Sequence, residues 1–422
     1  MARSFDVPVK YRSELVSRIK TVRRTADPLK KDLSPSILDF GPVRFKLARH
    51  FGFCYGVENA IEIAYRALEE NPDKRIFLLS EMIHNPHVNE DLQSRGIRFL
   101  RTTSGEQLIP FSELASDDVV IIPAFGTTLE IENKLLEIGI DVQSYDTTCP
   151  FVEKVWRRAG QIGGNGYSVI VHGKRSHEET QATFSHAAHG LMKASIGVEL
   201  EAATPVFVVR DLSEATYLSE YIKGEHSAQQ LLDRFPGQFS DNFSPERDLT
   251  RIGVVNQTTM LATETAEIVT LLKAAMVERY GRDQINDRFA DTSDTLCYAT
   301  NENQDAALAL IKSGGKLAIV VGGSNSSNTS HLVELCEVAM PTYFIRSAAQ
   351  IGGVSEIQHF DINTGQDIVT SDWLDTTEPV DIILTAGASC PDILLDEVIQ
   401  TVTALVPEAR SYDSVLDTFS IP

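Results

Sequence analysis

The chain has 422 residues, of which 42% are hydrophobic and 23% charged, the composition of an ordinary globular protein long enough for two or three domains. Its formal net charge of −21 excludes a general affinity for nucleic acid or for an anionic membrane surface, because both need a positively charged protein. Five cysteines without a signal peptide exclude a disulfide framework and indicate a reducing compartment, and no apolar run is long enough to span a bilayer.

Residues 1–45 are expected to form an N-terminal extension that lies on the domain surface and is partly helical around residues 11–24. Basic residues are frequent here, but Asp6, Glu14 and Asp27 lie among them, whereas transit peptides are poor in acidic residues. We therefore expect a cytoplasmic protein, with the plastid stroma as the less favoured location.

From about residue 45 the sequence alternates short β-rich runs with helix-like runs, which favours α/β layers with mainly parallel strands. The clearest strands are predicted at 75–80, 119–124, 167–172, 252–256, 316–322 and 380–386. The clearest helices are predicted at 57–70, 129–138, 151–162, 260–280, 327–340 and 391–406.

Three cysteines, Cys54, Cys149 and Cys297, each end a strand-like or turn-like run and begin a helix-like one, and the first two share the pattern Cys-x-x-Val-Glu. The second interval between them is longer than the first, and the excess falls on a polar, weakly patterned stretch near 211–250. This spacing predicts three similar α/β lobes with pseudo-threefold symmetry around a central cleft. The expected lobes are 46–149, 150–290 with an insertion near 211–250, and 291–422 with a C-terminal tail.

The three cysteines have two interpretations. A lone cysteine is most often a small buried hydrophobe, but thiolates are also the standard ligands of iron–sulfur clusters. Three isolated thiols brought to one point can hold three corners of an iron–sulfur cube and leave the fourth iron open. The residues alone leave both interpretations open. Cys336 lies on an apolar helical stripe and is predicted to be a core residue, and Cys390, at a strand-to-helix turn, is not expected to bind metal.

Several loops after predicted strands carry residues suited to anion binding and proton transfer. His177 and Glu179 lie in one such loop, where a histidine can donate to a phosphate oxygen and a carboxyl group can move a proton. The run Gly322–Ser330 combines glycines with hydroxyl and amide side chains. It lacks the lysine of a P-loop and the glycine spacing of a dinucleotide fold, which favours a small phosphate or diphosphate over ATP or NAD. A polar surface loop and a helix-capping turn are the corresponding structural alternatives.

Eight motifs, in this order, resemble the LytB/IspH family of 4-hydroxy-3-methylbut-2-enyl diphosphate reductases over about residues 46–406. They read GFCYGVENAI, EMIHNPHV, DTTCPFVEKV, HGKRSHEETQAT, NQTT, LCYAT, GGSNSSNTSHL and TAGASCPDILL. The resemblance implies three α/β lobes around a central iron–sulfur cleft. It also implies reductive dehydroxylation of the hydroxybutenyl diphosphate to isopentenyl and dimethylallyl diphosphates, the last step of the non-mevalonate isoprenoid pathway.

The resemblance further implies the residues of the site. Cys54, Cys149 and Cys297 would hold a 4Fe-4S cluster whose open iron meets the substrate hydroxyl. Glu179 matches the proton donor, and Thr258 matches the hydroxyl that orients the substrate and relays the proton. The diphosphate-binding set is matched by His84, His177, Ser326, Ser327, Asn328 and Ser389.

Three features resemble the plant and cyanobacterial branch of the family: the extension, the insertion, and Phe125 where many bacterial members have histidine. The expected electron donor is then ferredoxin, or flavodoxin, and neither nucleic acid nor membrane is an expected partner. Two other classes stay open. A three-cysteine enzyme of the quinolinate synthase type would lack the histidine, Gln-Thr-Thr and Ser-Ser-Asn motifs, and a non-enzymatic α/β ligand-binding protein would hold no iron.

Overall fold

The computed structural model describes residues 5–189, 203–241, 243–290 and 295–419, and these fall into two compact units. Unit 1 comprises residues 1–62, 83–91 and 298–422, and unit 2 comprises 63–82 and 92–297. Two helices, α2 (Tyr55–Glu70) and α3 (Pro86–Ser94), contribute residues to both units.

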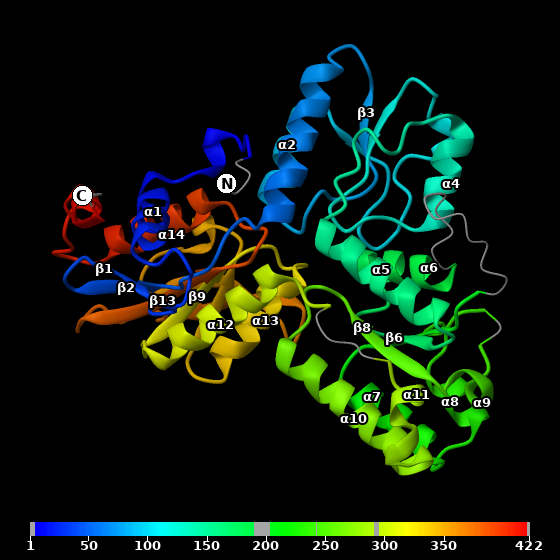
Figure 1. Cartoon of the computed structure of the whole chain (residues 1–422). Helices are drawn as coiled ribbons and strands as arrows, with labels where there is room; N and C mark the ends of the chain where they lie inside the picture. Colours follow the sequence, from blue (N-terminus) through cyan, green and yellow to red (C-terminus); the bar gives the residue numbers. More distant parts are fainter. Residues whose placement is uncertain (1–4, 190–202, 242, 291–294, 420–422) are drawn as a thin grey trace. The chain divides into compact units, whose positions relative to one another are not determined.

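Unit 1 is built on a five-stranded sheet with the order β1-β2-β13-β9-β10. The pair β1–β2 is antiparallel, and the other neighbours are parallel. Figure 1 shows α1 and α14 on one side of this sheet and α12 and α13 on the other. The strands of this sheet are β1 (Ser36–Asp39), β2 (Val43–Leu47), β9 (Leu317–Val321), β10 (Thr342–Ile345) and β13 (Val380–Ala386). Unit 1 also contains a separate hairpin of β11 (Glu356–Asp361) and β12 (Gln366–Ser371). Its helices are α1 (Glu14–Ala26), α12 (Tyr298–Lys312), α13 (Ser327–Glu337), α14 (Asp392–Leu405) and α15 (Tyr412–Leu416).

Unit 2 contains two three-stranded parallel sheets with the orders β4-β3-β5 and β7-β6-β8. The strands β6 and β8 are buried along their whole length, as expected of parallel strands that are covered on both faces. The strands are β3 (Ile76–Leu78), β4 (Arg98–Phe99), β5 (Val119–Ile121), β6 (Ser168–His172), β7 (Val206–Val209) and β8 (Ile252–Asn256). The helices are α4 (Leu129–Ile138), α5 (Pro150–Gly164), α6 (Glu178–Ala188), α7 (Leu212–Lys223), α8 (Ala228–Arg234), α9 (Pro245–Asp248), α10 (Ala262–Tyr280) and α11 (Ile285–Arg288).

The predicted fold class is confirmed, because the helices cover three sheets whose strands are mainly parallel. All six predicted strands and all six predicted helices are present, with ends that differ by a few residues. The helix predicted around 11–24 is α1. The remainder of the expectation for residues 1–45 needs correction: α1 buries Leu15, Val16 and Ile19 in the core of unit 1, and β1 joins its sheet, so the segment does not merely cover the surface.

The stretch near 211–250 is also folded, Asn242 lying outside the described residues. Its helices α7 and α8 bury Leu218, Ile222 and Leu231 in the same apolar cluster as residues of α10. The polar residues between these helices obscure the helical period in the sequence. The stretch is therefore part of the core of unit 2, while its status as an insertion remains a prediction.

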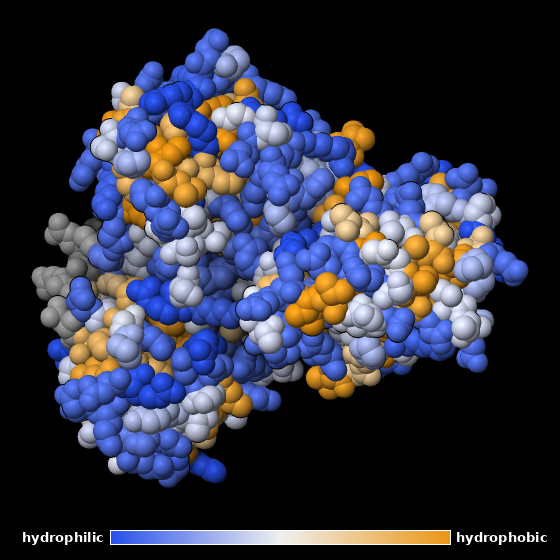
Figure 2. Space-filling model, turned by 180° about the vertical axis from the view of Figure 1, so that it is seen from behind, coloured by the Kyte–Doolittle hydropathy of each residue, from blue (hydrophilic) through white to orange (hydrophobic). Residues whose placement is uncertain are grey.

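In the part of the chain that the structure describes, no helix is long and apolar enough to cross a bilayer. On the face drawn in Figure 2, hydrophobic residues form scattered patches among hydrophilic ones. Single exposed apolar side chains such as Val9 and Val338 are ordinary on a protein surface and carry no functional assignment.

Candidate functional site

Three neighbouring parallel strands of unit 1, β2, β13 and β9, end at the same edge of the sheet. The segments that follow them carry Cys54, Ser389 and the run Ser326–Asn328, respectively. Ligands of open α/β sheets bind at the carboxyl ends of the strands. This edge therefore gathers side chains that are more than 330 residues apart in the sequence.

Cys54 immediately precedes α2, and its local hydrogen bonds fix its backbone. Its carbonyl accepts from Glu58 N at 3.0 Å, and its own N–H donates to Ala388 O at 3.1 Å. Burial raises the pKa of the Cys54 thiol, whereas hydrogen bonds from the N–H groups of Val57 and Gly56 lower it. A sulfur that accepts backbone N–H groups at a helix start is suited to carry the negative charge of a metal-bound thiolate.

Asn328 is connected to Cys54 through the backbone of a single residue, Ala388. The N–H of Ala388 donates to Asn328 Oδ1 at 2.9 Å, and the carbonyl of Ala388 accepts from Cys54 N. The side-chain Nδ2 of Asn328 is buried and has no hydrogen-bond partner among the described residues. A buried donor without an acceptor costs free energy, so this position fits a ligand that supplies acceptor oxygens, as a phosphate does.

The start of α13 adds hydroxyl and backbone donors next to Asn328. Ser326 is the N-cap residue, and its Oγ accepts from Thr329 N at 3.3 Å. The N–H groups of the first helical turn have no partner within the helix, which makes such a start suited to anions. Ser389 donates its hydroxyl to the backbone carbonyl of His84 at 3.1 Å, so the strand-end loop and the His84 segment are held together.

Gly323 allows this close approach, because a Cβ atom there would lie 2.3 Å from the His84 carbonyl oxygen. We expect Gly323→Ala to lower the free energy of unfolding by about 1–3 kcal/mol, since overpacking forces a shift of the backbone. Denaturant unfolding measures this change. Gly164→Ala is the matched control, because its Cβ would meet nothing within 4 Å, and alanine in the helix α5 should leave the stability unchanged or raise it by up to about 1 kcal/mol. Equal stabilities of both variants would contradict the steric explanation.

In unit 2, Glu179 and Thr258 lie in contact at the carboxyl ends of the neighbouring strands β6 and β8. Glu179 Oε1 accepts from Thr258 N at 2.5 Å, and Oε2 accepts from Thr258 Oγ1 at 2.9 Å. Glu179 is only 1% exposed. Burial raises its pKa to about 7, although both hydrogen bonds from Thr258 act in the opposite direction. The carboxyl group can therefore carry a proton near neutral pH.

His177 is the N-cap residue of α6, and its Nδ1 accepts from Glu179 N at 3.2 Å. Because Nδ1 accepts this hydrogen bond, a neutral His177 ring carries its proton on Nε2. The Phe125 ring meets the His177 ring edge-on, with 5.8 Å between their centroids. In this tautomer the imidazole can donate a hydrogen bond through Nε2.

Polar residues beside Thr258 position this loop, and the sequence analysis assigned them no role. Gln257 Oε1 accepts from Lys174 N at 3.2 Å and Thr180 Oγ1 at 3.0 Å, which ties the loop after β8 to the loop after β6. Thr295 hydrogen-bonds Asn256, and Cys297 N donates to Thr258 O at 3.4 Å. The only sequence signal for these roles was their position next to Thr258 and Cys297.

Cys149 and Cys297 also lie immediately before helices. Cys149 is the N-cap residue of α5, makes no capping hydrogen bond with its side chain, and donates its N–H to Ala124 O at 3.0 Å. None of the five cysteines forms a disulfide. Cys336 is fully buried in the core of unit 1, as predicted.

The residues matched by the resemblance divide between the units. Unit 1 contains Cys54, His84, Ser326, Ser327, Asn328 and Ser389, and unit 2 contains Cys149, His177, Glu179, Thr258 and Cys297. In the described ranges, no three His, Cys, Asp or Glu side chains form a group that could hold a metal ion. The donor chemistry of three thiols that form no disulfide, each directly before a helix, fits an iron–sulfur cluster.

Comparison with known proteins identifies the same relatives by sequence and by fold. The family model described as LytB protein matches residues 45–403. A 4-hydroxy-3-methylbut-2-enyl diphosphate reductase of Cyanothece sp. is 39% identical over 366 residues, 86% of this chain and 85% of that protein. The reductase of the same name from Nostoc sp. is 36% identical over 403 residues, 95% of this chain and 92% of that protein.

A solved structure has the same fold. The E-1-hydroxy-2-methyl-but-2-enyl-4-diphosphate reductase from Plasmodium falciparum matches with a TM-score of 0.60 at 21% identity. The match covers 85% of this chain and 87% of that one. At this identity the likeness concerns the fold alone.

Proposed function

The chain belongs to the LytB family, and on this premise we propose that it removes the hydroxyl group of 4-hydroxy-3-methylbut-2-enyl diphosphate by reduction, giving isopentenyl and dimethylallyl diphosphates. This is the terminal step of the non-mevalonate isoprenoid pathway. The observation that supports it most strongly is the buried Glu179, protonated near neutral pH and bonded to the Thr258 hydroxyl. Anaerobic turnover of that diphosphate with a reduced low-potential donor tests the proposal.

The diphosphate group is bound, in this proposal, by His84, His177, Ser326, Ser327, Asn328 and Ser389. The buried Asn328 Nδ2 supports this role, because a phosphate oxygen would supply the acceptor that it lacks among the described residues. The start of α13 and the Nε2–H of His177 add further donors. These neutral donors suit a polyanion in a chain whose net charge is strongly negative.

Cys54, Cys149 and Cys297 would hold a 4Fe-4S cluster. Such a cluster supplies electrons one at a time and an open iron that polarises the carbon–oxygen bond of the substrate. The absence of any disulfide at these three residues and their shared setting before a helix support the assignment. The backbone N–H groups at Cys54 would in addition stabilise a thiolate there.

Glu179 and Thr258 form the proton path. When protonated on Oε2, Glu179 donates to Thr258 Oγ1, and the hydroxyl proton of Thr258 then turns toward the leaving hydroxyl of the substrate. Two protons and two electrons convert that hydroxyl into water and leave a carbon–hydrogen bond. Burial excludes bulk water from Glu179, so the proton is transferred along this path.

We expect the turnover rate to fall as the pH rises through about 7, because Glu179 donates only while it is protonated. The raised pKa of Glu179 also makes the free energy of unfolding depend on pH. The contribution of Glu179 to stability is fully present below pH 4.5, where the carboxyl group is protonated, and it is lost as the pH rises through about 7. A pH profile of single-turnover rates measures the effect.

Glu178→Gln is the control for this profile, since burial also raises the pKa of Glu178 to about 7, and its carboxyl group interacts with Ser80. This variant should keep the decline near pH 7. Loss of the decline in Glu178→Gln would assign the titration to Glu178 and contradict the role of Glu179.

The reductant is proposed to be ferredoxin or flavodoxin, and the compartment to be the cytoplasm. The branch-specific features of the sequence support the first proposal. The bacterial source of the relatives from Cyanothece and Nostoc supports the second.

A further inference from the structure

A cavity of about 710 Å³ in unit 1 adjoins the backbone of Cys54. Its lining includes Cys54 itself and the flanking residues Phe53 and Tyr55. Five cationic side chains line it as well: Arg12, Lys20, Arg24, Lys30 and Arg49. We call this cavity the basic hollow. Three carboxylates line it too, namely Glu58, Glu302 and Asp392, so that positive charge is in excess.

This excess contrasts with the rest of the chain. Residues 1–49 hold 12 of the 38 Lys and Arg residues but only 5 of the 59 Asp and Glu residues. The remainder of the protein is strongly acidic. A local positive potential in such a chain attracts an acidic partner to the basic surface, while the acidic remainder of the protein repels it.

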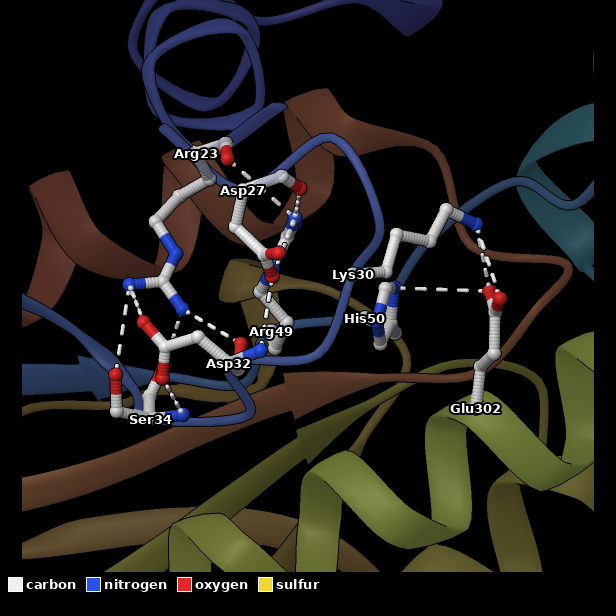
Figure 3. A network of polar contacts seen from close by, with 8 residues as sticks. All are labelled: Arg23, Asp27, Lys30, Asp32, Ser34, Arg49, His50 and Glu302. Atoms are coloured by element: carbon white, nitrogen blue, oxygen red, sulfur yellow. Dashed lines mark hydrogen bonds and ion pairs between the residues drawn. The ribbon is translucent and has the colours of Figure 1, made fainter. Parts of the chain in front are cut away.

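Figure 3 shows polar contacts of four residues that line the basic hollow, Lys30, Arg49, His50 and Glu302. Lys30 Nζ donates to both carboxylate oxygens of Glu302, at 3.0 and 2.9 Å, and His50 Nδ1 lies 3.7 Å from Glu302 Oε2. Burial lowers the pKa of His50 to about 4, so this ring is neutral at physiological pH. The segment after α1 is thereby tied to Glu302 of α12, next to His50.

Arg49 anchors the end of α1 in the same network. Its Nη2 donates to Asp27 O at 3.3 Å and lies 3.9 Å from Asp27 Oδ2, while Arg23 pairs with Asp32 at 3.2 Å. Arg49 therefore joins the end of α1 to the segment that leads to Cys54. The basic side chains of α1 are thus held in position before a partner binds.

Two of the cations form no close ion pair among the described residues, although the charge of Arg12 acts on the Glu58 carboxylate in the same lining. Lys20 pairs with Asp392 at 2.7 Å and Lys30 with Glu302, whereas Arg12 and Arg24 are exposed and form no ion pair among the described residues. Arg12 donates only to a carbonyl, Phe5 O, at 3.3 Å. These two guanidinium groups are available for carboxylates of another molecule.

We propose that the basic hollow is the docking surface for an acidic one-electron carrier protein that reduces the centre held by Cys54. This inference rests on the proposed function, in which two reduced carriers each give up one electron. The substrate takes up these two electrons and two protons, its carbon–oxygen bond breaks, and water leaves. Because Cys54 lines the hollow, a carrier bound there delivers its electron directly at a ligand of the cluster.

The test compares two reductants with the anaerobically purified protein. The double variant Arg12→Glu/Arg24→Glu should raise the KM for reduced ferredoxin by about tenfold or more, since reversing charges at a docking surface slows association. Its turnover with reduced methyl viologen should stay within about twofold of the parent, because that small reductant needs no docking surface. Added salt should raise the ferredoxin KM of the parent more than that of the variant.

Arg18→Glu is the matched control, because Arg18 lies on α1, as Arg24 does, but does not line the hollow. It should leave the ferredoxin KM nearly unchanged. If the double variant loses viologen turnover through misfolding, the single change Arg24→Gln at an exposed position replaces it and should still raise the ferredoxin KM. An unchanged ferredoxin KM in an active variant overturns the docking proposal. Absence of viologen turnover in an iron-loaded parent overturns the proposed function instead.

Discussion

Glu179→Gln is expected to lose turnover by about 10²–10⁴-fold, the contribution typical of a positioned general acid, while the protein keeps its iron. Glutamine has the shape of the protonated glutamic acid that burial favours at this position, but it cannot release a proton to Thr258. Its carbonyl oxygen can still accept from Thr258 N, so the loop after β8 should keep its place. The expected loss is therefore chemical and not structural.

Single-turnover rates and iron content together measure this effect. Glu178→Gln is the matched control, because Glu178 is a neighbouring buried carboxyl group with a similarly raised pKa. That variant should retain most of its activity. Full activity of Glu179→Gln would refute the proton-donor role, and loss of its iron would point to a structural role.

Cys149→Ser is expected to lose most of the bound iron and with it nearly all turnover. Serine is a poor ligand for iron–sulfur clusters but a favourable N-cap residue, and Cys149 is the N-cap residue of α5. The helix should thus be at least as stable in the variant as in the parent. Loss of iron would then report ligation and not unfolding.

Iron and sulfide analysis of anaerobically prepared protein, with circular dichroism as the check on folding, measures this prediction. Cys336→Ala is the control, because Cys336, like Cys149, forms no disulfide but is buried in the core of unit 1. It should keep its iron despite some loss of stability. An unchanged iron-to-protein ratio in Cys149→Ser would exclude Cys149 as a ligand.

Much of the fold follows from local patterns in the sequence. The strand predicted at 252–256 and the helix predicted at 129–138 have the same bounds as β8 and α4. A continuous apolar run marks a buried parallel strand, and a helical repeat of apolar residues marks an amphipathic helix. The role of β1 and β2 could not be predicted in this way. β2 pairs with β13, which lies more than 330 residues away, and no local pattern specifies such a pairing.

The contacts within the site could not be predicted without knowledge of the strand order. Glu179 and Thr258 meet because β6 and β8 are neighbours, an arrangement that the two sequence motifs do not contain. The bridge from Cys54 through Ala388 to Asn328 likewise depends on β2, β13 and β9 lying side by side. The positioning roles of Asn256, Gln257 and Thr295 could not be predicted from the sequence, because these roles depend on hydrogen-bond partners that are distant along the chain.

The most direct test of the central claim is an anaerobic assay of the iron-loaded protein with 4-hydroxy-3-methylbut-2-enyl diphosphate and reduced methyl viologen. The proposed function predicts isopentenyl and dimethylallyl diphosphates, with two equivalents of the one-electron reductant consumed for each molecule of product. Iron-loaded protein that oxidises no viologen and forms neither product would contradict it.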